Sequence, residues 1–310
     1  MMGFSRAQTI AFGLLVAVIL IAPAMLYPVF LMKVMCFALF ACAFNLLIGY
    51  VGLGSFGHAA FFGMGGYITA HTAKVWGLTP ELAILLGGLA GSMLGLVFGW
   101  LAIRRQGIYF AMITLALAQM SYFLCTQWDF TGGEDGIQGV PRGYLFGLIS
   151  LKPDLAMYAV VAVVFIACFL LIHRIVHSPF GQVLKAIREN EPRATSLGYR
   201  TDDYKLMVFV LSAAFAGIAG GMKSLVFGIA TLTDVHYAMS GEVILMALLG
   251  GMGTIFGPVV GAAIVITMQN YLAPFGAWVT VTQGVVFVVC VLAFRRGLVG
   301  ELAARRRLSL

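Results

Sequence analysis

Long apolar runs dominate this chain, and polar residues gather in the gaps between them. Ten runs can be outlined, at about 9–27, 28–49, 53–73, 80–103, 107–127, 155–173, 204–226, 238–255, 257–273 and 279–294. A helix needs roughly 20 mostly apolar residues to cross a bilayer, and the runs lack the strict alternation of a membrane barrel. The pattern predicts an all-α integral membrane protein of about ten transmembrane helices, folded as one polytopic domain over residues 1–310.

Composition agrees with a protein that is solvated by lipid. Of its 310 residues, 61% are hydrophobic and only 10% are charged, whereas soluble domains carry about 25% charged residues. The first run follows Arg6 and ends in Ala22-Pro23-Ala24, which also fits a cleavable signal peptide. Its length favours a membrane span, which completes an even number of helices.

Lysine and arginine are unevenly distributed between the two sides of the predicted membrane. If the N-terminus is cytoplasmic and spans alternate, 14 of the 19 basic residues fall on the cytoplasmic side. They are Arg6, Arg104, Arg105, Arg174, Lys185, Arg188, Arg193, Arg200, Lys205, Arg295, Arg296, Arg305, Arg306 and Arg307. Because cytoplasmic loops collect basic residues, both termini are predicted to lie in the cytoplasm. The net charge of +7 thus reflects orientation, and nothing indicates nucleic-acid binding.

Glycines recur every fourth residue in three of the predicted helices. The three rows are Gly87, Gly91, Gly95 and Gly99; Gly217 and Gly221; and Gly253, Gly257 and Gly261. Apolar side chains gain little by leaving lipid for one another, so membrane helices associate through close contact of small residues. These rows predict tight helix packing.

Two other stretches, 49–66 and 250–261, are still richer in glycine and resemble one another. Broken helices at related places in two halves of a chain often mark a transport site. Tight turns between adjacent spans would have the same composition, so the sequence leaves both interpretations open.

Several polar residues lie within or beside the apolar runs. Polar groups are costly in hydrocarbon, so they often line a pathway, although some only bond one helix to another. The candidates for a translocation path are Asn45, Ser55, His58, Thr114, Gln119 and Glu242. Ionisable residues are few at this depth, which argues against ion-coupled transport.

No motif indicates an enzyme, a metal site or a bound cofactor. The chain has no P-loop, HExxH or GxSxG sequence. Its five cysteines, Cys36, Cys42, Cys125, Cys168 and Cys290, lie in apolar runs without a CxxC spacing. Catalytic residues are therefore not predicted.

The segment 178–205 is the most polar part of the chain. Ser178 is a good helix N-cap and Pro179 suits the first turn. Phe180, Val183, Leu184 and Ile187 then form one apolar stripe, and Pro192 is expected to end this helix. Gly198 is expected to end a second short turn before the next span. A helix lying on the lipid surface is possible, but the mixed charge of the polar face favours a surface that contacts another protein.

Four ordered motifs resemble the branched-chain amino acid ABC permeases, particularly their LivM-type subunit. They are "NLLIGYVGLGSFGHAAFFGMGGYITA" (45–70), "TGGEDGIQGVP" (131–141), the segment beginning "SPFGQVLKAIRENEPRATSLGYRTDDYK" (178–205) and "GGMGTIFGPVVGA" (250–262). The resemblance extends from about residue 30 to residue 300 and implies a type II ABC importer-like fold. Urea and aromatic-acid systems use closely similar permeases, so the cargo stays open.

The resemblance implies that about 176–203 is a cytoplasmic coupling loop seated on an ATPase. Its contact residues would be Ser178, Pro179, Phe180, Gly181, Val183, Ile187, Arg188, Glu189, Glu191, Ala194 and Gly198. Arg188 and Glu189 would make polar contacts to the ATPase. Glu191, Ala194 and Gly198 look like a degenerate form of the importers' Glu-Ala-Ala…Gly loop, from which Pro192 departs. Gly181→Trp is expected to uncouple ATP hydrolysis from uptake.

The resemblance further implies that the chain lies in the inner membrane of a bacterium. It also implies partners: two cytoplasmic ATPase subunits, a second related permease, a periplasmic solute-binding protein and the surrounding lipid. ATP and magnesium would bind the ATPases and not this chain. The outer loop 128–144 is either a connector or a docking surface. The rival hypothesis is a stand-alone ion-coupled carrier, which predicts essential buried charges such as His58 or Glu242.

Overall fold

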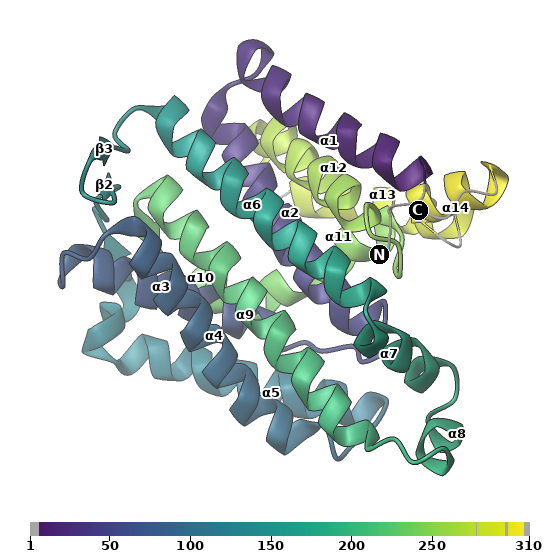
Figure 1. The fold of residues 1–310 in the computed structure, drawn as a ribbon. Coiled ribbons are helices and arrows are strands. Elements are labelled where there is room, and N and C mark those ends of the chain that lie inside the picture. The colour runs from purple at the N-terminus through teal and green to yellow at the C-terminus, as the bar shows by residue number, and fades with distance from the viewer. Residues whose placement is uncertain (1–5, 277, 295–296, 307–310) are drawn as a thin grey trace.

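The computed structural model describes residues 6–276, 278–294 and 297–306, and helices dominate it (Figure 1). The α-helices are α1 (Arg6–Met25), α2 (Pro28–Ile48), α3 (His58–Lys74), α4 (Pro80–Ala102), α5 (Ile108–Gln127), α6 (Asp154–His177), α7 (Pro179–Glu189), α8 (Glu191–Ser196), α9 (Thr201–Phe227), α10 (Leu232–Val235), α11 (Tyr237–Gly250), α12 (Gly257–Leu272), α13 (Trp278–Ala293) and α14 (Gly297–Arg306). The short elements are η1 (Asp129–Thr131), η2 (Gly133–Asp135), β1 (Ile137–Gln138), β2 (Tyr144–Leu145), β3 (Ile149–Ser150), β4 (Ile229–Ala230) and η3 (Ala273–Phe275).

Each predicted span corresponds to a helix, but not all of these helices are long. Within the described residues, seven are long and apolar enough to cross a membrane: α1, α2, α4, α5, α6, α9 and α12 with η3. Helices α3, α11 and α13 have 17, 14 and 16 residues. Helix α11 ends five residues before the predicted limit because Gly251 has a φ of +120°, a value that breaks helical geometry. The count of ten transmembrane helices is therefore approximate.

Helix α9 forms the centre of the fold and packs against α2, α3 and α4. Glycine makes the closest of these contacts possible. A methyl group on Gly65 of α3 would lie 2.4 Å from the Gly217 Cα, and one on Gly217 would lie 2.6 Å from the Gly87 carbonyl oxygen. The backbones of α3, α4 and α9 thus touch without intervening side chains, which is how membrane helices gain contact.

The other glycines of the predicted rows differ in their surroundings. Methyl groups on Gly91 and Gly95 would lie 2.5 and 2.4 Å from Ala213 atoms, and one on Gly99 would lie 2.7 Å from Leu206. A Gly221 methyl would approach the Thr69 hydroxyl to 2.5 Å.

The third predicted row belongs only partly to a helix contact. A methyl group on Gly261 of α12 would lie 1.9 Å from the Met246 carbonyl oxygen of α11, and one on Gly257 would lie 2.6 Å from the Gly251 carbonyl oxygen. Gly253 departs from the prediction. It lies in the loop before α12 with a φ of +77°, so it turns the chain and does not pack within a helix.

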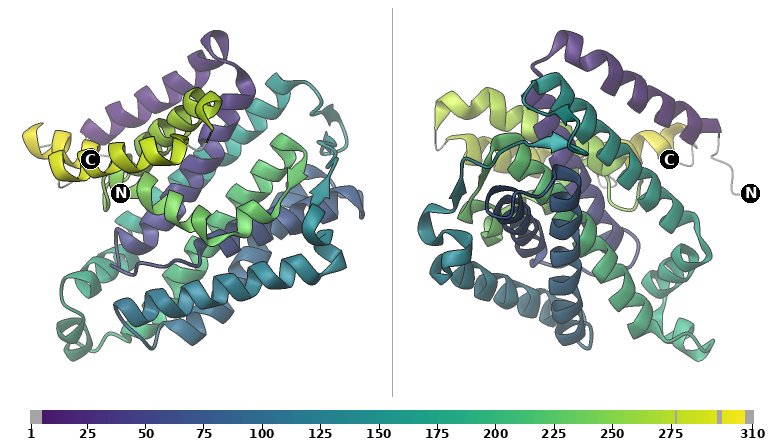
Figure 2. Two further views of the ribbon diagram at one scale, coloured as in Figure 1. Left: turned by 180° about the vertical axis from the view of Figure 1, so that it is seen from behind. Right: turned by 60° about the vertical axis from the view of Figure 1, so that its left-hand side comes forward.

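The two ends of the molecule differ. Helices α7 and α8, the start of α1 and the end of α14 lie toward one end, and β2 and β3 lie at the other, in Figure 1 and in the left panel of Figure 2. We call these the α7 end and the β2 end. Between them, α1 lies along the outside, with exposed apolar side chains such as Ile10, Leu14 and Leu20. Such a surface is suited to contact with lipid.

Candidate functional site

Helix α7 begins the polar segment that the sequence analysis singled out. The Ser178 hydroxyl accepts a hydrogen bond from the Gly181 amide at 3.3 Å, and Pro179 occupies the first turn. Leu184 and Ile187 are buried. The apolar stripe therefore faces the protein, while the opposite face of α7 remains exposed.

A second short helix, α8, follows after a single break at Asn190. The backbone of Asn190 is extended, with φ −158°, and its side chain accepts a hydrogen bond from the Arg193 amide at 3.0 Å. Pro192 lies in the first turn of α8, so the prediction that Pro192 ends the preceding helix is wrong: Asn190 ends it. Gly198 follows α8 with a φ of +91° and turns the chain toward α9.

Glu191 connects α8 to the helices beneath it. Its carboxylate forms an ion pair with Lys205 of α9, whose side chain is only 2% exposed. It also accepts a hydrogen bond from the Gln106 side chain at 2.9 Å. Ala194 on the same helix is buried. Helix α8 is thus fixed to both α9 and the α4–α5 connection.

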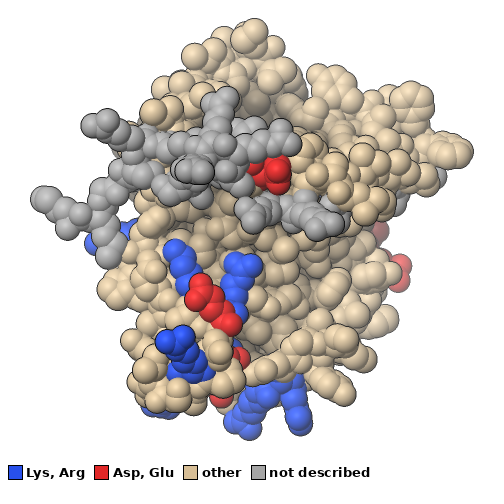
Figure 3. Space-filling model, turned by 90° about the vertical axis from the view of Figure 1, so that its right-hand side faces the viewer, with Lys and Arg blue, Asp and Glu red and all other residues tan. Residues whose placement is uncertain are grey.

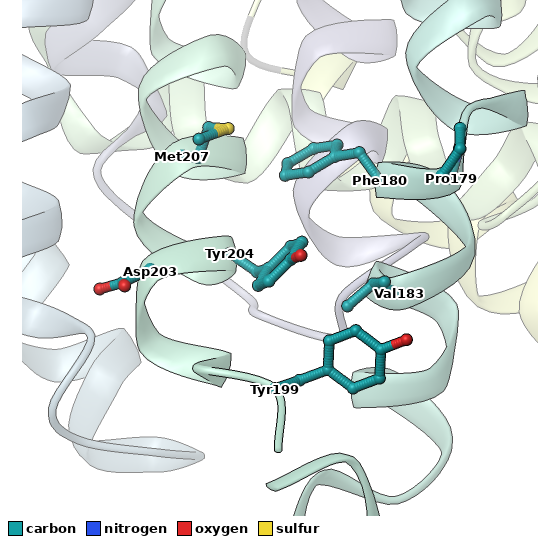
Figure 4. A pocket seen from close by; sticks show the side chains of 7 residues that line it. All are labelled: Pro179, Phe180, Val183, Tyr199, Asp203, Tyr204 and Met207. Carbon is teal, nitrogen blue, oxygen red and sulfur yellow. The ribbon is translucent and has the colours of Figure 1, made fainter. Parts of the chain in front are cut away.

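A groove of about 500 Å³ opens between α7 and the start of α9 (Figure 4). Figure 4 shows Phe180 and Val183 pointing from α7 toward Tyr204 on α9. The Phe180 and Tyr204 rings stack with their centroids 5.6 Å apart. Pro179, Tyr199, Asp203 and Met207 complete the lining. The groove is mostly apolar, and Tyr199 and Met207 on its edge are 41% and 56% exposed.

The two glycine-rich stretches meet each other close to α7. The Asn45 side chain donates to the Thr254 carbonyl at 2.9 Å and accepts from the Gly253 amide at 2.9 Å. We call residues 49–57 and 251–256 together the glycine junction. Arg188 of α7 donates a hydrogen bond to the Gly49 carbonyl in this junction. The Lys185 ammonium lies 5.9 Å from the centroid of the Tyr50 ring, which gives α7 a second contact there.

The six predicted path residues do not form one cluster. Besides Asn45, three of them surround the start of α3. Ser55 accepts from the Gly57 amide at 3.1 Å, and Thr114 accepts from the Phe56 amide at 3.1 Å. His58 is fully buried and bonded to the Ser212 hydroxyl at 2.8 Å. Gln119 lies half-buried on α5.

Glu242, the sixth candidate, lies in a second cavity of about 260 Å³ toward the β2 end. We call this the outer cavity. Five elements supply its polar groups, which are Lys33 of α2, Lys223 of α9, Asp234 of α10, Glu242 of α11 and Gln269 of α12. Lys223 pairs with Asp234 at 2.7 Å, and Gln269 donates to Glu242 at 3.0 Å.

The sequence analysis did not include Lys33, Lys223 or Asp234 among the candidate path residues. Both lysines fall inside predicted apolar runs, at their β2 ends, and that position is the signal that marks them. A charged group within a span usually has a partner or a pathway. Sequence alone does not indicate that α2, α9 and α10 meet at one place.

The outer loop is held firmly to the helices below it. Arg142 pairs with Asp154 at 2.6 Å and donates to the Val226 carbonyl at 3.1 Å. The Lys74 ammonium donates to the Gln138 carbonyl at 2.7 Å. Strand β1 also pairs with β4, which places Ile137 opposite Ala230. The loop is therefore a folded surface at the β2 end.

Basic side chains gather on the surface of the α7 end. Figure 3 views this end, and Lys and Arg are more abundant there than Asp and Glu. Arg295, Arg296 and Arg307, which the sequence analysis counted among the basic residues of this side, lie outside the described residues.

Across the described part of the chain, no cluster of three His, Cys, Asp or Glu could hold a metal ion.

Comparison with known proteins gives relatives along most of the chain. The high-affinity branched-chain amino acid transport system permease protein LivM of Salmonella typhimurium is 26% identical over 287 residues, covering 85% of this chain and 68% of that protein. The ribose import permease protein RbsC of Bacillus subtilis is 27% identical, covering 72% and 70%. LivH of Salmonella typhimurium, a permease of the same branched-chain system, is 25% identical, covering 74% and 79%. No solved structure matches the chain.

The match to a protein family is broader still. Residues 26–294 match the family described as the branched-chain amino acid transport system permease component. That range contains every predicted motif, the glycine junction, the outer cavity and α7 with α8. The chain therefore belongs to the family of branched-chain amino acid transport system permease components.

Proposed function

We propose that this chain is the permease subunit of an ATP-driven importer that moves branched-chain or other apolar amino acids inward by alternating access. One observation carries the proposal beyond family membership. Helix α7 presents a free polar face outward, while Arg188 on the same helix bonds the glycine junction. A force applied to α7 from outside the chain would reach the α2–α3 and α11–α12 connections directly.

The contacts of α7 and α8 support a role in coupling. We assign the outward faces of α7 and α8, including Glu189, to contact with an ATPase subunit. Arg188 carries five N–H donors, so it can hold Gly49 and a partner at the same time. Glu191 would carry the same movement into α9 through Lys205. The groove beside Phe180 and Tyr204 would accept an apolar side chain of the ATPase.

This function requires partners, and the proposal names them. Two ATPases with their ATP and magnesium would sit at the α7 end, which is then cytoplasmic, as are both termini. A second permease of the LivH kind would complete the pathway. A periplasmic solute-binding protein would dock at the β2 end, on the folded outer loop.

The test is purification in mild detergent followed by reconstitution into vesicles. We expect two ATPases and a second permease to copurify and L-leucine uptake to need ATP. Ala186→Cys on the exposed face of α7 should crosslink to an ATPase, whereas Leu148→Cys, exposed at the β2 end, should not. A Cys290→Ser background removes the one half-buried cysteine. A chain that purifies alone, or crosslinks to an ATPase only through Leu148→Cys, would refute the proposal.

The outer cavity gives the rival function its one specific support. Half-buried charges within the helices, such as Lys33 and Glu242, are what an ion-coupled carrier would use. That function predicts uptake by the isolated chain, driven by a proton or sodium gradient without ATP. The same vesicles distinguish the two outcomes when ATP or the gradient is omitted in turn.

Gly181→Trp is not the best test of coupling. A methyl group on Gly181 would already lie 2.2 Å from the Val176 carbonyl oxygen at the end of α6. A tryptophan there would displace α7 from α6 and disturb the local fold. Arg188 offers a cleaner substitution, because its side chain extends from α7 to the glycine junction.

A further inference from the structure

We propose that the outer cavity is a solute-binding site that holds the zwitterionic group of an α-amino acid, with Lys33 facing the carboxylate and Glu242 facing the ammonium. That the solute is an amino acid rests on the proposed function, whereas the residues that bind it follow from the charges and shape of the cavity.

The polar groups of the cavity are balanced in charge. Two lysines and two carboxylates line it, so the site is neutral overall but has separate positive and negative poles. Each comes from a different helix, and Lys33, Lys223 and Gln269 lie near the β2 ends of long apolar helices. Charged groups are expensive at such positions unless they are paired or face a pathway.

The four charged residues differ in how many hydrogen bonds and ion pairs they already form within the chain. Lys223 and Asp234 satisfy one another, and their side chains are only 12% and 8% exposed. Asp234 also accepts hydrogen bonds from the Thr231 amide at 3.4 Å and the Thr231 hydroxyl at 3.1 Å. This pair therefore fixes α10 to α9 and has little capacity left for a ligand.

Lys33 and Glu242 keep hydrogen-bonding groups that can bind a ligand. Lys33 faces the cavity half-buried, and no acceptor for its ammonium group is found in the described part of the chain. Glu242 uses one carboxylate oxygen for Gln269, which leaves the other available. The two side chains line the same cavity but form no ion pair within 4.0 Å among the described residues. A separated cation and anion match the two charges of an amino acid.

The remaining wall suits an apolar side chain. Phe37, Phe227, Ile229 and Met239 line the cavity beside the charges. Its volume of about 260 Å³ is just below the roughly 300 Å³ at which pockets begin to fit drug-sized ligands. A small solute with one polar head and one apolar tail fits this arrangement best.

The test measures occupancy of the cavity by protection from labelling. Met239→Cys in the Cys290→Ser background introduces a thiol into the cavity wall, and a water-soluble maleimide reports its access in the full chain with whatever partners copurify in mild detergent. L-leucine should slow the labelling. The analogues 4-methylpentanoate, which lacks the ammonium group, and 3-methylbutylamine, which lacks the carboxylate, should not.

Substitutions of Lys33 and Glu242 test which residue binds the carboxylate and which binds the ammonium group of leucine. Lys33→Met and Glu242→Gln should each raise the half-protecting leucine concentration by about 10- to 100-fold, the effect of losing one charged hydrogen bond. Lys33→Arg keeps the charge and should keep the protection, which separates recognition from misfolding. Lys152→Met changes an exposed residue at the β2 end outside the cavity and should leave protection unchanged.

Several results would overturn the proposal. They are a thiol that never reacts, equal protection by all three compounds, and unchanged protection in both cavity variants. Failure of the proposed function looks different: ATPases would not copurify and uptake would not need ATP, although leucine still protected the cavity. Conversely, ATP-driven uptake without protection would reject this site alone.

Discussion

The α7 end and the outer cavity both hold charged groups next to apolar helices, but they use them in opposite ways. At the α7 end the charges are bound within the chain: Arg188 to the Gly49 carbonyl and Glu191 to the buried Lys205. In the outer cavity, Lys33 and one oxygen of Glu242 face open space. Groups that are already bonded transmit movement, whereas groups with spare capacity can bind a solute. Of the four substitutions below, two remove bonded charges of the α7 end, one fills a glycine contact of α9 and one removes an aromatic pair beside α7; they are given from the largest expected effect to the smallest.

Removing Glu191 should have the largest effect. Glu191→Ala leaves the Lys205 ammonium buried without its partner, and an unpaired buried charge costs about 3–5 kcal/mol of stability. We expect a lower melting temperature in detergent. Glu189→Ala is the matched control, because Glu189 is exposed on α7 and its loss should leave the melting temperature nearly unchanged. Equal effects would mean that the Glu191–Lys205 pair does not hold α8 in place.

Arg188→Met should disconnect α7 from the glycine junction, because it replaces the guanidinium by an unbranched apolar side chain of about the length of the arginine stem. Loss of a charged hydrogen bond costs about 1.5–3 kcal/mol. We expect solute uptake per ATP hydrolysed to fall about tenfold, since 1.4 kcal/mol corresponds to that factor, with membrane insertion intact. Unchanged uptake per ATP would assign the transmission to another contact.

Gly217→Ala should separate α9 from α4. The added methyl would lie 2.6 Å from the Gly87 carbonyl oxygen, and such overpacking costs about 1–3 kcal/mol. The melting temperature should fall. Gly241→Ala adds a methyl to α11 where no atom lies within 4 Å, and we expect it to be neutral or slightly stabilising. If both variants melt alike, the close contact contributes little to stability.

Phe180→Ala should have the smallest effect. It removes the stacking on Tyr204, which is worth about 0.5–1.5 kcal/mol for an aromatic pair. A double-mutant cycle with Tyr204→Ala, followed by thermal melting, measures that energy. Leu197→Ala, at a residue that is 70% exposed, is the control. A coupling energy of zero would mean that the groove is not held open by this pair.

The sequence predicts the helices well because local rules determine them. Apolar length locates every span, Ser178 and Pro179 start α7, and Gly198 turns the chain after α8. The errors arise where local sequence signals misplace the exact end of a helix. Helix α6 continues to His177, four residues past its predicted end, and ends only at Ser178, whose backbone is extended and which caps α7. Pro192 was predicted to break a helix, but it lies in the first turn of α8, where its missing N–H has no cost.

The candidate site was less predictable, since its parts come from distant positions. The similarity of the two glycine-rich stretches is visible in the sequence, but their contact through Asn45 and Gly253 joins residues more than 200 positions apart. Likewise, Lys33 and Glu242 each look like isolated charges until α2 and α11 are packed together. Composition identifies a membrane protein, and only tertiary contact shows which of its polar residues face each other.

Helix α9 links the two regions in one straight element. Lys205 near its start holds Glu191 of α8, and Lys223 near its end lines the outer cavity. A helix of 27 residues is about 40 Å long at 1.5 Å per residue, so pivoting it by about 4° at its middle moves each end by roughly 1.4 Å in opposite directions. Because α9 is clamped between α3 and α4 by backbone contacts, it would act as a lever whose fulcrum is the glycine contact. A push on α8 would then shift Lys223 and Asp234 together and change the width of the cavity at the far end of the molecule.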